Sequence, residues 1–470
     1  MAPIIHKVQK AHFTHDPRRF YQNKHQILAL VISPTRELAE QLAAEARKFT
    51  YGTGVRVQTA VGGSLKRKGL AMIQDKGCNV LIGTPGRLND VLSMPPGTGV
   101  DAPDLKMLVL DEADQLLDQG FWPEVQSVMK YLPSGESDGR QTVMFSATAP
   151  NEIMRVVREA LKRDYKFIKT ISDTEPPTHL KVPQKVVWLN GFENSLSSVL
   201  DILKGYVRNG HDAPPLKAIV YFNSGREVEM ATELFSILQF DNPELLGGPH
   251  ISIVGLHSRL TQAQRTANAN KFRKAQSSVL FSTDLTARGM DFPDVTHVIQ
   301  VGIPKDRDTY IHRVGRTGRM DKSGEGWLLI SDADHKYERR LKGLPLEEAT
   351  TETSNVDIPE MQEEGQLGGK NPSFESIDEV NSAMEMLPQV VKYLAFTTLS
   401  GVLASRNTNK VECLRILQRV ALYGYRFSKM PPLSDYAKNM LGLVPEGSAR
   451  EMKTTPRANR KYATSWYRFQ

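Results

Sequence analysis

Short apolar runs recur along the first third of the chain, and each ends in polar residues or in a turn that carries Gly or Pro. Residues 28–32, 79–83 and 107–110 form such runs, and 141–145 follows them. Runs this short and without alternation are typical of strands buried on both faces of a parallel sheet. Stretches with helical spacing separate them, so the pattern predicts an α/β domain over residues 28–171.

A second series of strands alternates with helical stretches further along the chain. Between the two series, residues 172–184 are Pro-rich and unperiodic, which is typical of a hinge. The sequence therefore predicts a second parallel-sheet domain, with right-handed crossovers, over residues 185–346. Its strands are expected at 218–222, 251–256, 279–282, 298–301 and 327–330.

The character of the chain changes after the second domain. Residues 347–379 are acidic and carry Gly and Pro, which predicts a flexible connector. Apolar residues such as Leu414, Leu417 and Ala421 then recur at helical spacing. They predict an α-helical extension over residues 380–449 that packs on the second domain.

Both ends of the chain are basic. Residues 1–27 contain a single acid, Asp16, and suit either a mitochondrial targeting segment or a plain basic start. Residues 450–470 mix Lys and Arg with Tyr, Trp and Phe. Charge beside aromatic faces suits sequence-tolerant binding of single-stranded RNA, and a solvated tail without a target is the alternative.

Composition limits the class of protein. The 470 residues carry a formal net charge of +7, which favours a polyanionic partner. The two cysteines, Cys78 and Cys413, are too few for a disulfide framework and lack metal-ligand spacing, so a reducing compartment is expected. Apolar runs of membrane-spanning length are absent, so no membrane association is expected.

The apolar run at 107–110 ends in Asp111, Glu112, Ala113 and Asp114. Acids at the carboxyl end of a buried parallel strand lie where open α/β sheets bind ligands. An Asp there can hold Mg²⁺ directly or through water, and a neighbouring Glu can orient an attacking water. Alternatively, these acids cap the helix that follows. Taken alone, the stretch leaves both interpretations open.

Five further motifs surround the acidic stretch and favour the ligand-binding interpretation. In chain order they are ISPTRELAEQ at 32–41, TPGRL at 84–88, FSATAP at 145–150, STDLTARGMDFPDV at 282–295 and YIHRVGRTGR at 310–319. Together they resemble the DEAD-box RNA helicases, a superfamily 2 group with two RecA-like domains. The resemblance covers residues 28–346 and implies an ATP hydrolase that binds RNA.

The resemblance also implies ATP and Mg²⁺ as cofactors and assigns roles to residues of this chain. Asp111, Glu112, Arg316 and Arg319 would be catalytic, with Asp111 holding Mg²⁺ through water and the arginines stabilising charge on the phosphates. Asp291 and Gly289 would contact the nucleotide beside these four. Residues that couple the nucleotide to RNA would be Asp114, Ser146, Thr148 and His312. Residues that grip the RNA backbone would be Pro34, Thr35, Arg36, Gly63, Thr84, Pro85, Gly86, Arg87, Gln262, Arg265 and Thr283.

One element of the family pattern is not found in this sequence. Hydrolysing members have a phosphate loop of the A-x-x-G-x-G-K-T type and a Gln-containing motif upstream, whereas no Gly-Lys-Ser or Gly-Lys-Thr occurs here and no Gly precedes Gly52. Loss of the strand that leads into this loop should expose a neighbouring strand as an open edge. An incomplete gene model or splice form is one explanation, and a remnant that binds RNA without hydrolysis is the other.

The sequence as a whole predicts a DEAD-box RNA helicase that couples ATP binding and hydrolysis to local opening of RNA duplexes. The alternative is an ATP-independent RNA-binding or annealing remnant. The extension resembles that of the fungal mitochondrial members that assist intron splicing, which implies the mitochondrial matrix; nucleus or cytoplasm is the alternative. We expect a monomer and a sequence-tolerant grip on RNA.

Overall fold

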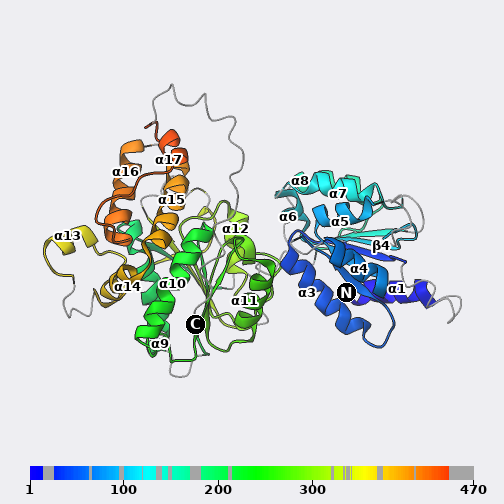
Figure 1. The fold of residues 1–470 in the computed structure, drawn as a ribbon, viewed down its shortest axis with the longest axis horizontal. Helices are drawn as coiled ribbons and strands as arrows, with labels where there is room; N and C mark the ends of the chain where they lie inside the picture. Colours follow the sequence, from blue (N-terminus) through cyan, green and yellow to red (C-terminus); the bar gives the residue numbers. More distant parts are fainter. Residues whose placement is uncertain are drawn as a thin grey trace.

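Two strands that end in predicted motifs, β1 (Ala29–Ile32) and β4 (Met107–Leu110), lie side by side in the first of two parallel sheets. The computed structural model describes residues 1–13, 26–62, 66–94, 100–118, 120–133, 140–146, 151–169, 182–209, 214–318, 322–331, 334, 339, 341–367, 374–406 and 409–443. Figure 1 shows two α/β lobes, with a helical extension stacked on the second. The first lobe is formed by residues up to 169 and the second by residues 182–349.

The first lobe holds a five-stranded parallel sheet in the order β2-β3-β1-β4-β5. Ala29 is in register with Val80 on one side and with Met107 on the other, so β1 lies at the centre. The remaining strands are β2 (Val57–Ala60), β3 (Val80–Gly83) and β5 (Gln141–Met144). The helices are α1 (Ala2–Phe13), α3 (Arg36–Thr50), α4 (Lys66–Lys76), α5 (Pro85–Leu92), α6 (Ala113–Asp118), α7 (Trp122–Met129) and α8 (Asn151–Ala160).

β5 is the exposed edge of this sheet. β1, β3 and β4 are buried at every position, whereas Gln141 is exposed and the next three residues of β5 are half-buried. The following Phe145 is 55% exposed. Sequence analysis predicted an open edge of this kind, because the strand that leads into the phosphate loop in the family is not found in this sequence.

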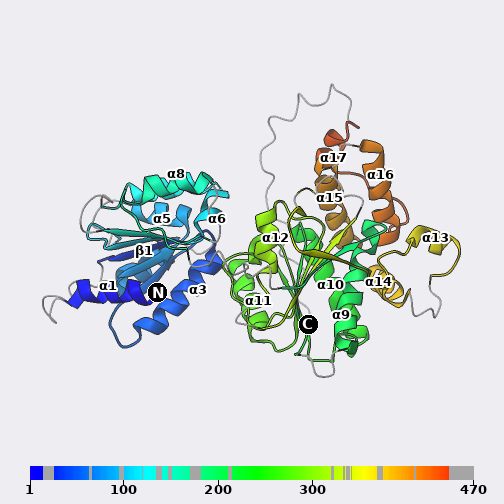
Figure 2. The ribbon, with the colours of Figure 1, turned by 180° about the vertical axis from the view of Figure 1, so that it is seen from behind.

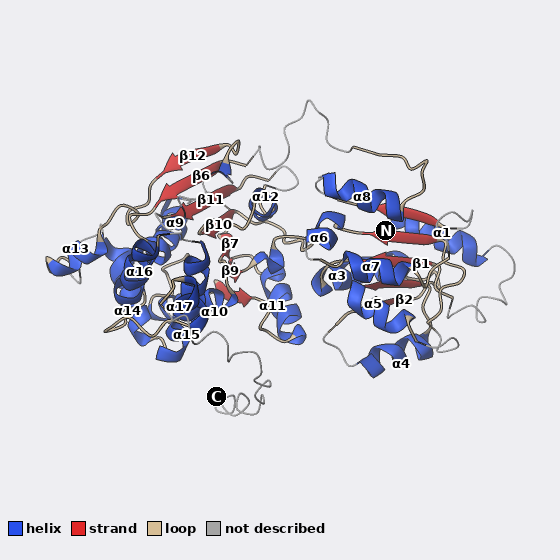
Figure 3. Ribbon diagram, turned by 90° about the horizontal axis from the view of Figure 1, so that it is seen from above, coloured by secondary structure: helices blue, strands red, loops and turns tan. Residues whose placement is uncertain are grey.

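The second lobe holds a seven-stranded parallel sheet in the order β12-β6-β11-β10-β7-β9-β8, seen from above in Figure 3. Its strands are β6 (Gln184–Trp188), β7 (Lys217–Tyr221), β8 (Ser252–Leu256), β9 (Ser278–Ser282), β10 (His297–Val301), β11 (Glu325–Ile330) and β12 (Leu346–Ala349). Its helices are α9 (Ser195–Asn209), α10 (Gly225–Asp241), α11 (Gln262–Lys274) and α12 (Arg307–Val314), with short 3-10 turns η2 (Phe192–Asn194) and η3 (Asp284–Thr286). All nine strands expected from the sequence are present, each within two residues of its expected ends.

The expected flexible connector is wrong at its start. β12 pairs with β6 and extends the second sheet to Ala349, beyond the expected boundary at 346. Thr353 is fully buried, and its amide and hydroxyl donate to Asp201 Oδ2 at 2.9 and 2.7 Å. Backbone pairing and a buried polar network therefore fix a stretch whose acidic composition suggested disorder.

The basic start of the chain also differs from expectation. α1 is part of the first lobe, because Ile4 and Val8, one helical turn apart, are buried in one cluster with Leu28, Ala39 and Ala43. The hinge at 172–184 lies outside the described residues except at its last three positions, and residues 450–470 lie outside them entirely.

The helical extension packs on the second lobe as predicted. It consists of α14 (Glu375–Met386), α15 (Gln389–Arg406), α16 (Lys410–Arg419), a π-helical turn η6 (Val420–Gly424) and α17 (Asp435–Met440), preceded by the short α13 (Ile358–Glu363). A single hydrophobic cluster joins the lobe to the extension, and α10 contacts both α14 and α15. The nearly buried ammonium of Lys204 reaches Glu375 at 2.8 Å and Glu379 at 2.7 Å. The described residues include no helix with the length and apolar character that a membrane crossing requires.

Candidate active site

The acidic residues lie at the carboxyl edge of the first sheet. Asp111 directly follows β4, and its amide donates to Ile32 O at 3.0 Å. The amide of Ala113, at the start of α6, donates to Phe145 O at 2.9 Å. Between them Glu112 has a left-handed backbone with φ of 49°. Hydrogen bonds to the two neighbouring strands thus hold the turn, and strain of this kind is common at functional sites.

Asp111 and Glu112 both hold protons more tightly than ordinary carboxyls do. Burial, together with the charge of Glu112, raises the pKa of Asp111 to about 6. Burial and the charge of Asp114 raise the pKa of Glu112, partly offset by His312, Arg316 and Arg288. The Glu112 Oε2 atom is buried and has no hydrogen-bond partner among the described residues. A buried oxygen without a protein donor fits a site for water or a hydrated cation better than a helix cap.

Asp114 joins the two lobes. Its Oδ2 atom lies 3.3 Å from Arg288 Nη1 and 3.6 Å from His312 Nε2, both of the second lobe. Ser146 Oγ, after β5, donates to Asp114 Oδ1 at 3.1 Å. Burial raises the pKa of Asp114, but the approach of His312 and the charge of Arg288 outweigh it, so the pKa lies below its usual range. Asp114 therefore remains ionised in the contact between the lobes.

Arg316 follows the end of α12 and lies near the acidic turn, which is formed by Asp111, Glu112, Ala113 and Asp114. It is nearly buried, its Nε atom donates to His312 O at 3.3 Å, and its Nη1 atom donates to Met290 O. Its charge is close enough to lower the pKa of Glu112. The structure therefore brings Arg316, His312 and the acidic turn together, as predicted. Arg319, Thr148 and Gly63 lie outside the described residues.

The predicted nucleotide residues of the second lobe lie directly against α3. Gly289 has φ of +68°, and a Cβ there would be 2.7 Å from Leu38 Cδ2. The amide of Asp291 donates to Gln41 Oε1 at 3.2 Å. Gly289 thus permits close approach of the lobes, and its contact with a nucleotide stays a prediction.

α3 and α11 face each other across the same boundary, as Figure 2 shows from behind. Arg265 Nη1 lies 2.7 Å from Glu37 Oε1, and Gln262 Nε2 donates to the same oxygen at 3.3 Å. Thr266 Oγ1 donates to Glu40 Oε2 at 3.2 Å. Burial, the largest influence, raises the pKa of Glu40. Gln262 and Arg265 are engaged by the first lobe here, so their contact with RNA stays a prediction.

Sequence reasoning assigned no function to five residues of this contact: Glu37, Glu40, Gln41, Thr266 and Arg288. A signal was nevertheless present. Glu37, Glu40 and Gln41 share one helix face at spacings of three and four, and Gln262, Arg265 and Thr266 share another. Complementary polar faces on two helices can mark a contact between domains.

The predicted RNA residues of the first lobe gather at one edge of its sheet. Ile32 and Gly83 are in register, so the loops after β1 and β3 are neighbours, and they carry Pro34 to Arg36 and Thr84 to Arg87. Thr35 caps α3, since its Oγ1 atom accepts from Leu38 N at 3.2 Å. Arg36 lies against Gly62, where a Cβ would be 2.7 Å from its guanidinium. In the second lobe Thr283 Oγ1 accepts from Leu285 N at 3.5 Å and caps η3.

Two family models match the chain. Residues 1–156 match the DEAD/DEAH box helicase model, and residues 196–321 match the model named Helicase conserved C-terminal domain. The first match begins at residue 1, which agrees with the packing of α1 in the first lobe; the expected basic N-terminal segment is therefore part of this lobe at Ala2–Phe13.

Two curated relatives are similar over most of the chain. "ATP-dependent RNA helicase mss116, mitochondrial" of Aspergillus fumigatus is 45% identical over 454 residues, which are 93% of this chain and 68% of that protein. "ATP-dependent RNA helicase cyt-19, mitochondrial" of Neurospora crassa is 38% identical over 456 residues, which are 94% of this chain and 70% of that protein. Both relatives are mitochondrial, which confirms the mitochondrial assignment, and neither supports the ATP-independent alternative.

A solved structure of Mss116p bound to ssRNA and AMP-PNP has the same fold. It superposes with a TM-score of 0.70 at 26% identity and covers 91% of this chain and 81% of its own. The predicted RecA-like architecture with a helical extension is therefore confirmed. With this fold, the acidic turn at the lobe boundary and these relatives, the chain belongs to the DEAD-box family of ATP-dependent RNA helicases.

Proposed function

We propose that this chain couples the state of a nucleotide at the lobe boundary to its grip on mitochondrial RNA, including RNA that undergoes splicing. The contacts of Asp114 with Arg288 and His312 carry this proposal, because they exist only when the two lobes are in contact. The solved relative in complex with ssRNA and AMP-PNP supports both ligands.

The acidic turn fits ATP–Mg²⁺. The buried Oε2 atom of Glu112 has no hydrogen-bond partner among the described residues, and burial together with the charge of Glu112 raises the pKa of Asp111; a hydrated cation would stabilise both carboxylates. When bound, ATP–Mg²⁺ supplies the phosphoanhydride that is cleaved. Asp111 would hold the metal through water, Glu112 would orient the attacking water and take up its proton, and Arg316 with Arg319 would stabilise negative charge on the phosphate. Asp291 and Gly289 contact the nucleotide from the second lobe.

RNA is held through its backbone. Pro34, Thr35 and Arg36 after β1 and Thr84, Pro85, Gly86 and Arg87 after β3 form one edge for phosphates, with Gly63, Gln262, Arg265 and Thr283 as further contacts. Phosphate contacts carry no sequence information, so recognition is sequence-tolerant. Closure of the lobes brings both sets of contacts onto one strand and opens a duplex locally, and the chain acts as a monomer.

Coupling runs through Asp114. Ser146 and His312, with Thr148, link the end of β5 to α12 through this carboxylate. Hydrolysis of the nucleotide beside Glu112 alters the neighbouring contact of Asp114, which holds the lobes together. The lobes then open, and the two halves of the RNA site separate.

RNA-stimulated release of phosphate from ATP by this chain tests the proposal, with Glu112→Gln as the control. We expect release that depends on Glu112, which would mean that another segment takes the place of the phosphate loop, and RNA binding that a non-hydrolysable ATP analogue strengthens. The proposed coupling would be contradicted if the analogue did not change the affinity for RNA and if phosphate release did not depend on Glu112. The chain would then be an RNA-binding protein without ATP-dependent activity.

A further inference from the structure

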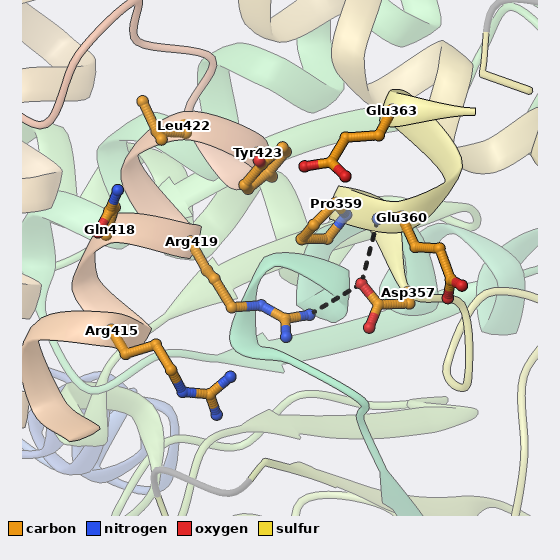
Figure 4. Close-up of a pocket in the computed structure, with 9 residues that line it drawn as sticks. All are labelled: Asp357, Pro359, Glu360, Glu363, Arg415, Gln418, Arg419, Leu422 and Tyr423. Atoms are coloured by element: carbon orange, nitrogen blue, oxygen red, sulfur yellow. Dashed lines mark hydrogen bonds and ion pairs between the residues drawn. The ribbon is translucent and has the colours of Figure 1, made fainter. Parts of the chain in front are cut away.

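A cleft of about 430 Å³ lies between α13 and the end of α16, far from the nucleotide residues in sequence. Figure 4 shows its two walls. Pro359, Glu360 and Glu363 of α13 form one, and the other comes from α16 and the π-helical turn η6. The residues that complete the lining are Asp357, Arg415, Gln418, Arg419, Leu422 and Tyr423.

Ion pairs and a hydrogen bond hold the two walls of the cleft in place. Its floor is fixed by Arg419, whose Nε atom lies 2.6 Å from Glu193 Oε1 and whose Nη2 atom lies 3.6 Å from Asp357 Oδ1. A second link joins α13 to the segment after η6, since Arg426, whose backbone is left-handed with φ of 55°, donates from Nη1 to Gln362 Oε1 at 2.6 Å. The two walls are therefore held at a set distance without a ligand, and conformations of this kind are common at functional sites.

The π-helical turn shapes the second wall. Tyr425 N donates to Val420 O at 2.8 Å, five residues back, and this wider turn carries Leu422 and Tyr423. Gly424 lies so close to η2 that a Cβ would be 3.3 Å from Glu193 Cα. Single π-helical turns cost stability relative to an α-helix and recur at binding sites.

The charges in the cleft select the ligand. Both arginines are already neutralised, Arg419 by Glu193 and Asp357, and Arg415 by Glu412 at 2.6 Å. Among the residues that the structure describes, no ion pair engages Glu360 or Glu363. In Figure 4 the Glu363 carboxylate points across the cleft toward Tyr423. A cation between a carboxylate and an aromatic ring is favoured, whereas a phosphate would be repelled.

We propose that this cleft binds an arginine or lysine side chain in an extended, basic segment of a protein partner. Glu363 pairs with the cationic group, Glu360 on the same helix adds negative charge nearby, Tyr423 and Pro359 contact the aliphatic stem, and the exposed Gln418 amide is available to the peptide backbone. The site does not depend on nucleotide or on closure of the lobes. RNA is the competing occupant, which the free carboxylates disfavour.

Fluorescence anisotropy of the full chain with a labelled peptide of alternating arginine and glycine tests the proposal. Because ion pairs at exposed positions are weak, we expect Glu360→Gln with Glu363→Gln to weaken peptide binding only about fivefold. The same peptide with citrulline in place of arginine should bind as weakly to the unaltered chain. A matched pair of exposed acids on β12, Glu347→Gln with Glu348→Gln, controls for loss of charge and should leave binding unchanged.

A second variant separates the two classes of ligand. Tyr423→Ala should weaken binding of the arginine peptide about threefold and leave affinity for a short oligouridylate unchanged. Equal peptide binding by the cleft and control variants would overturn the proposal. So would absence of peptide binding, or an oligouridylate affinity that falls with Tyr423→Ala and rises with the two glutamine substitutions, because the cleft would then take RNA.

Discussion

Arg265 Nη1 lies 2.7 Å from Glu37 Oε1 across the lobe boundary, and the two side chains are only 9% and 4% exposed. Sequence reasoning assigned Arg265 to RNA, yet its partner here is a carboxylate of the other lobe. Removing one member of a buried pair leaves an uncompensated charge at a cost of about 3–5 kcal/mol. The cost falls on the closed state alone, because water reaches Glu37 when the lobes separate.

We therefore expect Arg265→Ala to weaken analogue-dependent RNA binding on the order of a hundredfold while the lobes stay folded. Titration of labelled RNA with and without a non-hydrolysable ATP analogue measures this. The exposed Lys271→Ala on the same helix is the control. Replacing both Glu37 and Arg265 by Gln should recover part of the affinity, since neither charge is then left unpaired; no recovery would favour a direct contact of Arg265 with RNA.

Gly289 and Leu38 form a second contact between the lobes. Gly289→Ala would place a Cβ 2.7 Å from Leu38 Cδ2 at a φ of +68°. We expect closure to fail and the analogue to lose most of its effect on RNA binding. Gly52→Ala is a matched control, because Gly52 has a φ of +75° with nothing within 4 Å of the added atom. If both variants behaved alike, backbone strain and not the contact with Leu38 would be responsible.

Asp111 should make stability depend on pH. Burial raises its pKa to about 6, so between the pKa of an unfolded Asp, about 3.9, and pH 6 the folded state binds more protons than the unfolded state. Its contribution to stability is therefore present at low pH and is lost as pH rises through 6. At neutral pH the ionised group costs up to about 3 kcal/mol, which Asp111→Asn removes.

Thermal unfolding at several pH values checks the role of Asp111. We expect Asp111→Asn to raise the Tm of the first lobe at pH 7.5 and to have little effect at pH 4. Asp90→Asn, at an exposed position on α5, should change neither value. A gain in Tm that is equal at both pH values would mean that packing, and not titration, explains the effect.

Local pattern was enough for most of the fold. Runs such as 107–110 carry their own burial signal, because a strand covered on both faces must be apolar throughout. β12 gave no such signal: its sequence LEEA exposes two glutamates, and the strand forms because its backbone pairs with β6. α1 did carry a signal in Ile4 and Val8, but its basic composition masked it.

For the candidate site too, local pattern revealed some residues and missed others. Asp111, Glu112 and Ser146 could be found because they follow β4 and β5, and neighbouring parallel strands end at one edge of the sheet. The contacts that Glu37, Gln41 and Asp114 make with the second lobe could not be found in this way, because those partners lie more than 170 residues away and depend on how one lobe sits against the other. Contacts between lobes follow from rigid-body placement, which local spacing does not encode.

The open edge of β5 gives a further prediction. Gln141 N and Phe145 N donate to carbonyls beside β4, so by alternation Val143 faces β4 as well, and Thr142 and Met144 direct their amides away from it. Within the described residues no strand pairs with that side. Hydrogen–deuterium exchange should therefore be on the order of a thousandfold faster at Thr142 and Met144 than at Val143. Slow exchange at all three amides would show that another segment pairs with β5 in solution, as a strand leading into a phosphate loop would.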